Sequence, residues 1–554
     1  MAEYVDEITL PQKIKLFHRQ LEDIRKPWEE DWEIISEYVQ PRREGIKNTY
    51  KRGKRKGTKM YDGTPSSALL LLADGFLGYL ISPSMQWFRL MLEREKLTEL
   101  PGVKLWLQEC AEEMYSAFHR TNFYEQMHEY FLDGGSIGTA TIYTEEDLDQ
   151  GKIVFKTIHP REIYIAENIY GEVDTVYRAF QLSARNAVEK FGYENLSLQI
   201  QKAAKDRPYE MFDFIHAVFP NDKRVYGKLN NQNKKFVSIY IEKDGNEIIK
   251  QSGYDSMPFA VWRYRKNSNE WYGRSPAHDA LVDIMGLNQM GKDMLEASHL
   301  SVKPPYNVPA EMRGRVRITP GGMNYYEELN RIVTPVHTGI NYPIGIDREE
   351  KKEELIRKHF RVDFFLMLAQ AERQMTATEI IERQSEKAAV LGASIGRLQS
   401  ECLNPIIDRV FEIEYRAGRL PRVPSVLQDY AGTGIRVDYV GPLAQAQRRL
   451  FRTQGVTRTI EILSGLLEFK PELADNIDWD VVAREIMDSN NFPQQAIRDP
   501  ELVARIREAR AKAVEAQQRM EQMKQMAEVV PKVSKKVEEG SVLDQLQNAG
   551  AGAA

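Results

Sequence analysis

Apolar residues recur every three or four positions near the start of the chain, which is the pattern of a helix with one buried face. This repeat covers residues 8–38, and we expect Pro27 to break or kink the helix because proline lacks a backbone N–H. Similar patterns predict helices over residues 62–80 and 105–132. The apolar positions of the first repeat are Ile14, Phe17, Leu21, Ile24, Trp28, Ile34, Ile35 and Tyr38.

From residue 139 the pattern changes to short runs of β-branched and aromatic residues, separated by acidic and glycine-containing turns. Such runs are typical of β-strands. The front half of the chain is therefore predicted to be α+β, and the whole chain α+β but mainly α-helical. The expected strands are 141–143, 153–158, 173–180, 212–218, 236–241 and 259–264, with a short helix at 183–191.

Two long helices are expected to bracket a compact non-helical insert at residues 304–346. Ser275 occupies the N-cap slot of the first helix and Pro276 its first helical position. The helix can run to residue 303, a span on the order of 40 Å at ~1.5 Å per residue. A capping-box pattern predicts that the second helix starts at Asp347. An arm of this kind suits a structural machine component better than an enzyme pocket.

The C-terminal part reads as further helices separated by short breaks. A second capping box at residues 376–379 starts a long helix, which Pro405 is expected to kink or end. The last helix begins at Asp499, carries a heptad of mostly Ala and Met, and is followed by a tail predicted to be disordered. Because an Ala/Met seam is thin, a ring of close-packed helices suits this heptad better than a dimeric coiled coil.

Composition narrows the class of protein. The 554 residues carry a net charge of −5, which argues against a clamp that holds nucleic acid over its whole surface. Two cysteines make no disulfide framework, and no Cys/His cluster suggests zinc. The most apolar run, residues 68–81, is too short to span a membrane and contains Asp74.

Enzymatic motifs are not found. There is no phosphate-binding loop and no nucleophile elbow, and the nine histidines are scattered without metal-ligand spacing. The glycines of residues 134–138 lie between a helix and a strand, the reverse of the order in a phosphate loop, so they predict tight helix–strand packing. We therefore expect no catalytic residue, no metal, no cofactor and no enzyme activity.

A basic tract precedes the helix predicted over residues 62–80, and it has two interpretations. It either contacts DNA or an acidic partner protein, or it is a solvated loop, since charge runs of this length are often only loops. Its cationic residues are Lys51, Arg52, Lys54, Arg55, Lys56 and Lys59.

Seven short motifs occur in order over roughly residues 10–500. They are Met60-Tyr-Asp-Gly-Thr-Pro65 with Ala73-Asp-Gly-Phe-Leu-Gly78, Ser82-Pro-Ser-Met-Gln-Trp-Phe-Arg-Leu90, Gly138-Thr-Ala-Thr-Ile-Tyr143, Gly171-Glu-Val-Asp-Thr-Val-Tyr-Arg178, Tyr272-Gly-Arg-Ser-Pro276, Met375-Thr-Ala-Thr-Glu-Ile380 and Gly441-Pro-Leu-Ala-Gln-Ala-Gln447. Together they resemble the head-to-tail connector, or portal, family of short-tailed bacteriophages.

The resemblance implies a dodecameric ring at one capsid vertex, with a central channel through which double-stranded DNA enters and leaves. It implies a portal-type fold divided into named segments. These are the wing (1–274), a stem helix (275–303), the clip (304–346), a second stem helix (347–370), the tunnel loop (371–378), a long wing helix (379–417), the crown (418–498), a barrel helix (499–530) and the tail (531–554).

The partners that the resemblance implies are other copies of the chain, major capsid and scaffolding proteins, the large terminase subunit and a tail adaptor protein, but no membrane. The protein would be assembled in the host bacterial cytoplasm and reside in the virion at the head–tail vertex. A channel through which DNA moves must not hold the DNA tightly. Each phosphate neutralised by Lys or Arg strengthens DNA binding, so a net acidic ring suits such a channel.

The resemblance also points to candidate site residues. The tunnel loop would place Arg373, Gln374 and Met375 at the narrowest part of the channel. Arg373 would touch DNA phosphates, or alternatively pair with Glu372 or Glu379 of a neighbouring copy. Candidates for partner docking in the clip are Arg313, Arg315, Arg317 and Arg331.

Two other functions stay open at this point. One is a different structural virion protein, such as a tail component, in which the helix–insert–helix arm would have no counterpart. The other is a DNA-packaging enzyme, against which the missing phosphate loop and metal cluster count.

Overall fold

The computed structural model describes residues 9–534 apart from a set of internal gaps. The predicted tunnel loop, most of the predicted crown and the end of the predicted tail lie outside the described residues. The chain divides into two units, Met1–Ile477 and Asp478–Ala554. The gaps are residues 42–44, 48–56, 99, 148–149, 226–227, 229, 246, 320–322, 326–331, 337–341, 371–391, 429–433, 443–474, 476, 490–496 and 499.

The N-terminal helices follow the predicted pattern. The first apolar repeat forms α1 (Leu10–Arg25) and α2 (Trp28–Tyr38), and Pro27 occupies the N-cap of the second helix, so the predicted break is confirmed. Helix α3 (Thr64–Leu80) lies within the predicted range and supplies Leu72 and Phe76 to the core.

The single helix predicted over residues 105–132 is wrong, because the structure has α5 (Pro101–Arg120) and α6 (Phe123–Ser136) there. The break lies at Thr121, whose ψ of 176° is extended. The Asn122 amide donates to the Phe155 carbonyl at 2.8 Å and accepts from the Phe155 N–H at 3.2 Å. A side chain that bonds a distant main chain in this way competes with continuation of the helix.

The β-rich region forms an antiparallel five-stranded sheet in the order β4-β5-β6-β7-β8. Side chains alternate across it: Ile215 and Ala217 face the core beneath α1, whereas Phe214 lies beneath α7 (Ala184–Phe191). The sequence patterns indicated β5, β6 and β7 but missed β4 and the edge strand β8. The strands are β4 (Ile163–Glu167), β5 (Val173–Ser183), β6 (Met211–Pro220), β7 (Phe236–Glu242) and β8 (Ile248–Tyr254).

A second sheet of three strands has the order β3-β2-β9 and packs into the largest core. A further two-stranded ladder, β1–β12, joins the early and late parts of the first unit and was not predicted. These strands are β1 (Phe88–Leu92), β2 (Thr139–Asp147), β3 (Lys152–Ile158), β9 (Phe259–Arg263) and β12 (Ile435–Tyr439). The shorter helices are α4 (Glu95–Thr98), α8 (Leu198–Asp206) and α14 (Ser425–Gln428).

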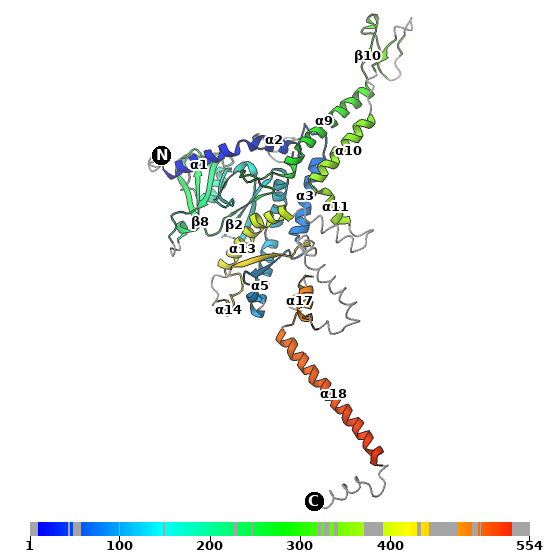
Figure 1. The fold of residues 1–554 in the computed structure, drawn as a ribbon. Helices are drawn as coiled ribbons and strands as arrows, with labels where there is room; N and C mark the ends of the chain where they lie inside the picture. Colours follow the sequence, from blue (N-terminus) through cyan, green and yellow to red (C-terminus); the bar gives the residue numbers. More distant parts are fainter. Residues whose placement is uncertain are drawn as a thin grey trace, which may run out of the picture. The chain divides into compact units, whose positions relative to one another are not determined.

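Two antiparallel helices form the arm, α9 (Pro276–Val302) and α10 (Tyr342–His359), which lie side by side with the ladder of β10 (Tyr306–Asn307) and β11 (Thr334–Pro335) at their far end (Figure 1). The first helix has the predicted limits. The second begins at Tyr342, so the predicted start at Asp347 is wrong. Pro343 lies in the first turn, where a helix needs no donor from it.

The second arm helix also ends early, at a sharp corner before α11 (Val362–Gln370). Arg361 has a φ of 58°, a left-handed conformation that is uncommon outside glycine. Phe360 and Phe365 are buried on either side of it, and a Cβ on Gly75 of α3 would collide with the Phe365 ring. Aromatic burial therefore fixes the corner.

The long helix predicted over residues 379–417 is described only from residue 392 onward. It contains a π-helical turn, η6 (Gln399–Leu403), before α13 (Asn404–Arg416). Pro405 has no N–H to donate to the Glu401 carbonyl. The Asn404 N–H bonds the Gln399 carbonyl, five residues back, in place of the Ser400 carbonyl that an α-helix would use. Pro405 thus lies next to an irregularity, as expected, although the helix continues.

The second unit contains α17 (Trp479–Ser489) and α18 (Pro500–Ser534). Pro500 is the first residue of α18, as predicted. The expected end at residue 530 is wrong, because the helix continues past Pro531. At that position proline removes one main-chain hydrogen bond without ending the helix.

Candidate functional site

The base of the arm is built from the segment Tyr272 to Ser275. Tyr272 is 1% exposed, accepts a hydrogen bond from the Ile165 N–H at 3.2 Å and meets the Trp32 ring edge-on. Arg274 exchanges two main-chain hydrogen bonds with Arg265, at 2.7 and 3.2 Å. The arm therefore emerges from a fixed point in the core.

Two glycines make this junction possible by letting two backbones touch. A Cβ on Gly273 would lie 2.9 Å from the Arg263 Cα and even closer to the Gly138 carbonyl oxygen, while one on Gly138 would lie 2.5 Å from the Gly273 carbonyl oxygen. Gly138 also has a φ of +86°, which favours glycine. Gly134 packs against the Trp262 ring. The predicted role of residues 134–138 in tight packing is confirmed.

Ser275 and His278 cap the first turn of α9. The Ser275 hydroxyl donates to the Ser136 carbonyl at 2.5 Å, and the Ser275 N–H donates to His278 Nδ1 at 3.2 Å. Nδ1 must be unprotonated to accept this bond. Burial lowers the pKa of His278 to about 4, and the positive charges of Arg274 and Arg265 act in the same direction. The cap is thus intact at neutral pH.

We expect the free energy of unfolding to fall as the pH drops from about 6.5 towards 4. Across this window the unfolded chain takes up a proton on His278 that the folded chain excludes, so the unfolded state gains stability. The loss due to this residue is about 3 kcal/mol. Chemical denaturation at a series of pH values measures it.

His278→Gln is the matched control, because Gln at this position also accepts from the N-cap N–H. The variant should keep its neutral-pH stability and lose part of the dependence between pH 4 and 6.5. Identical pH profiles for both proteins would refute the role of His278.

The two arm helices are joined near their base by charge. Lys352 of α10 donates to Asp283 of α9 at 2.8 Å, and its side chain crosses Gly286, where a Cβ would lie 3.2 Å from the Lys352 amine. His359 Nε2 lies 4.0 Å from the other oxygen of Asp283. These contacts hold α10 against one side of α9.

The insert beyond the arm exposes the predicted docking residues. Arg313, Arg315 and Arg317 are all exposed, and the Asn324 amide bonds the main chain of Arg317 on both sides, at 2.7 and 2.9 Å. Arg331 lies outside the described residues. Large apolar side chains are exposed close by in sequence, at Ile318, Met323 and Tyr325.

The end of the basic tract is fixed against α9. The Asn288 amide donates to the Lys59 carbonyl at 3.0 Å and accepts from the Tyr61 N–H at 2.8 Å. The Lys59 amine pairs with Glu37 at 2.8 Å. The other basic residues of the tract, at positions 51–56, lie outside the part of the chain that the structure describes, as do Arg373, Gln374 and Met375 in the predicted tunnel loop.

A buried ionic cluster, which no sequence motif indicated, centres on Arg263 in β9. Arg263 is 1% exposed, and its guanidinium contacts Glu401 at 2.6 Å, Glu167 of β4 and the Gly171 carbonyl at 3.0 Å. The Arg263 N–H also donates to Glu401 at 2.9 Å. The cluster ties the π-helical turn to both sheets.

Glu401→Gln is expected to lower the free energy of unfolding by ~3–5 kcal/mol. Removing one partner of a buried pair leaves the other charge without full compensation. The matched control is Glu353→Gln, which breaks the half-exposed pair with Arg357 at 2.8 Å and should cost only about 0–1 kcal/mol. Equal losses in the two variants, measured by chemical denaturation, would contradict this role of the cluster.

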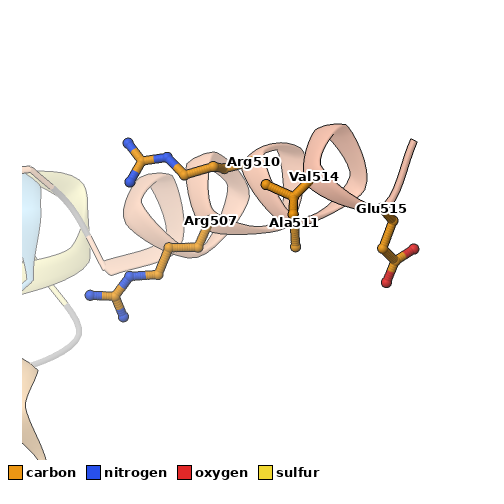
Figure 2. Close-up of a pocket in the computed structure, with 5 residues that line it drawn as sticks. All are labelled: Arg507, Arg510, Ala511, Val514 and Glu515. Atoms are coloured by element: carbon orange, nitrogen blue, oxygen red, sulfur yellow. The ribbon is translucent and has the colours of Figure 1, made fainter. Parts of the chain in front are cut away.

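The second unit carries a shallow surface hollow on α18, lined by Arg507, Arg510, Ala511, Val514 and Glu515 (Figure 2). All five side chains project from one helix. Arg507 makes a bidentate ion pair with Asp480 of α17 at 2.5 and 2.6 Å. The hollow is therefore part of the surface of one helix, and Arg507 is bound to a structural partner.

The described residues contain no group of three or more His, Cys, Asp or Glu side chains arranged to hold a metal ion. In the same part of the chain, none of the helices combines the length and apolar character that a membrane crossing requires.

Comparison with known proteins gives two kinds of match. Residues 12–497 match the family described as bacteriophage head to tail connecting protein. The chain is 30% identical over 516 residues to the portal protein of Salmonella phage epsilon15, covering 90% of this chain and 91% of that relative. It is also 30% identical over 543 residues to the probable portal protein of Bordetella phage BPP-1, covering 96% and 95% of the two chains.

Proposed function

Because the chain belongs to the family of bacteriophage head to tail connecting proteins, we infer that it is a structural component of the virion at the head–tail junction and fills the portal role there. We propose that it does so as a ring of twelve copies at one capsid vertex, with DNA passing through the central channel during packaging and ejection. The observation that carries this proposal is full-length similarity to portal proteins of two phages.

The structure of the arm supports separate roles for its helices and its insert within such a ring. We propose that α9 and α10 form the stem and that residues 304–341, the part of the predicted clip before α10, form the clip, which docks the large terminase subunit during packaging and the tail adaptor protein afterwards. Three features support this: the insert lies at the far end of two helices, Arg313, Arg315 and Arg317 are exposed, and apolar side chains accompany them. Exposed arginine beside aromatic and apolar residues is typical of protein interfaces.

We also propose roles in the ring for the remaining segments. The N-terminal 274 residues form the wing, which faces the major capsid and scaffolding proteins. Residues 418–498 form the crown, and α18 joins its copies in a barrel. The basic tract of residues 51–59 attracts an anionic partner through its charge, and Lys59 at its end is held next to α9 by Asn288.

Arg373→Ala is expected to leave ring assembly unchanged but to weaken DNA retention, with a smaller salt dependence than the unaltered protein. Each phosphate contact removed reduces the number of counterions that binding releases. DNA retention in assembled particles is measured over a series of salt concentrations, with Gln374→Ala as the uncharged control. If both variants retain DNA like the unaltered protein, residue 373 is not a phosphate contact.

Electron microscopy of the purified protein viewed end-on tests the ring. We expect closed rings with a central hole. A monomer or an open filament under assembly conditions would refute the proposed architecture.

The two other functions have less support. A tail component would not account for similarity to portal proteins over more than 90% of each relative. For a DNA-packaging enzyme, measured ATP hydrolysis that an active-site substitution abolishes would be required.

A further inference from the structure

Helix α9 has an apolar face that the core covers only in part. Near the base of the arm this face is buried through Ala277, Ala280, Ile284 and Leu287. About three turns beyond Ile284 the same face continues with Leu295, and two turns later with Val302. These two side chains are 49% and 75% exposed. The apolar face thus extends past the end of the core that buries it.

A second apolar face lies nearly opposite the first. Val282, Met285 and Leu300 share it, because three residues are about one turn and eighteen residues are five turns. Their exposed fractions are 80%, 47% and 42%.

Near the base of the arm, the other arm helix packs against the side of α9 that carries Asp283 and Gly286, as the contacts of Lys352 show. In a single copy, the outer half of α9 leaves Leu295 and Val302 exposed on one face and Leu300 exposed on the nearly opposite face. A solvent-exposed arm gains nothing from apolar residues on two sides unless other protein covers them.

We propose that the cover is the neighbouring copy of this chain on each side, and that the Leu300 face of one copy packs against the Leu295 and Val302 face of the next. This inference rests on the proposed ring. A ring of identical copies joins two different faces at every contact, and the two faces observed here meet that requirement. When arms run along the ring axis, rotation leaves Leu300 of one copy between Leu295 and Val302 of the next in height, about 3 Å from Val302. DNA phosphates are bound by Lys and Arg side chains, so these apolar faces favour protein over DNA as the partner.

Cysteine cross-linking in the full-length chain tests this contact. Leu300→Cys with Val302→Cys should give a ladder of multimers under mild oxidation, seen on a non-reducing gel. Across the proposed contact the two positions differ in height by only about 3 Å. On one helix they lie on nearly opposite faces with their Cβ atoms pointing apart, so bridges form only between copies. The native Cys110 and Cys402 are buried and do not interfere.

Each single variant should stay uncross-linked, because a head-to-tail contact does not bring a residue next to itself. The matched double control is Ile169→Cys with Leu300→Cys: Ile169 is 90% exposed but lies on the β4–β5 turn, so no ladder is expected. End-on microscopy of the same samples reports assembly independently. Rings without a ladder would overturn this interface and leave the portal role intact, whereas the absence of rings in the unaltered protein would overturn both.

A second measurement covers the case in which the double variant fails to assemble. In the Leu295→Cys single variant, maleimide labelling should be at least tenfold slower in assembled rings than in dissociated chains. The Ile169→Cys variant should label at equal rates in both states. Equal rates for Leu295→Cys would overturn the proposal.

Discussion

Replacing residues 304–341 with a short Gly/Ser linker is expected to abolish DNA packaging and tail attachment while the rest of the chain still folds. The insert closes on itself: β10 pairs with β11, and the Val336 N–H donates to the Pro305 carbonyl at 2.8 Å. Its two ends therefore leave from adjacent helix ends, and the arm helices keep their own contact through Lys352 and Asp283. Segments with adjacent ends are removed without strain on the remaining fold.

Complementation of a phage that lacks its own portal gene measures the result as infectious particles, with an expected loss of several orders of magnitude. The control is the triple variant Arg313→Ala, Arg315→Ala and Arg317→Ala, which keeps the insert but removes its exposed described arginines. We expect its yield of infectious particles to lie between those of the linker variant and the unaltered protein. If particles with the linker still package DNA and attach tails, residues 304–341 are not the docking module.

Gly273→Val is expected to destabilise the first unit by ~4 kcal/mol or more, enough to prevent assembly. The new Cβ would lie 2.9 Å from the Arg263 Cα and closer still to the Gly138 carbonyl. Backbone atoms cannot turn aside as a flexible side chain does, so the junction between the arm and the core must open. Overpacking in a well-packed interior costs ~1–3 kcal/mol when side chains can adjust, and more when they cannot.

Gly78→Ala provides the matched control for a glycine replaced in the same unit. Gly78 lies within α3, and a Cβ there meets no atom within 4 Å. Because alanine is the better helix former, this variant should be ~0.5–1 kcal/mol more stable. Chemical denaturation measures both changes. A Gly273→Val protein that unfolds like the unaltered one would refute the importance of the close backbone approach.

Elements bounded by local chemistry were predictable from the sequence. Pro27 separates α1 from α2, and Ser275-Pro276 marks the start of α9, because a proline or a cap acts within its own turn. The glycines of residues 134–138 were interpreted correctly for the same reason: their order between helix and strand is a local property.

Features set by distant partners could not be predicted. The break between α5 and α6 depends on Asn122 reaching Phe155, and the buried cluster joins Arg263 to a carboxylate 138 positions away. Neither spacing leaves a periodic signal. Among the candidate site residues, Arg313, Arg315, Arg317 and Lys59 are exposed, as surface contacts require. The docking role of the three arginines came from the resemblance and that of Lys59 from the charge of its tract, and both stay predictions.

The ladder between β1 and β12 has a consequence for how the chain is made. It joins positions as far apart as Arg89 and Asp438, whose side chains meet at 3.2 Å across 349 residues of sequence. A ribosome adds roughly 5–20 residues per second, so β1 waits on the order of 20–70 s for its partner to be synthesised. The first unit therefore completes its core late in translation, and a nascent chain stopped before residue 435 lacks the strand that pairs with β1.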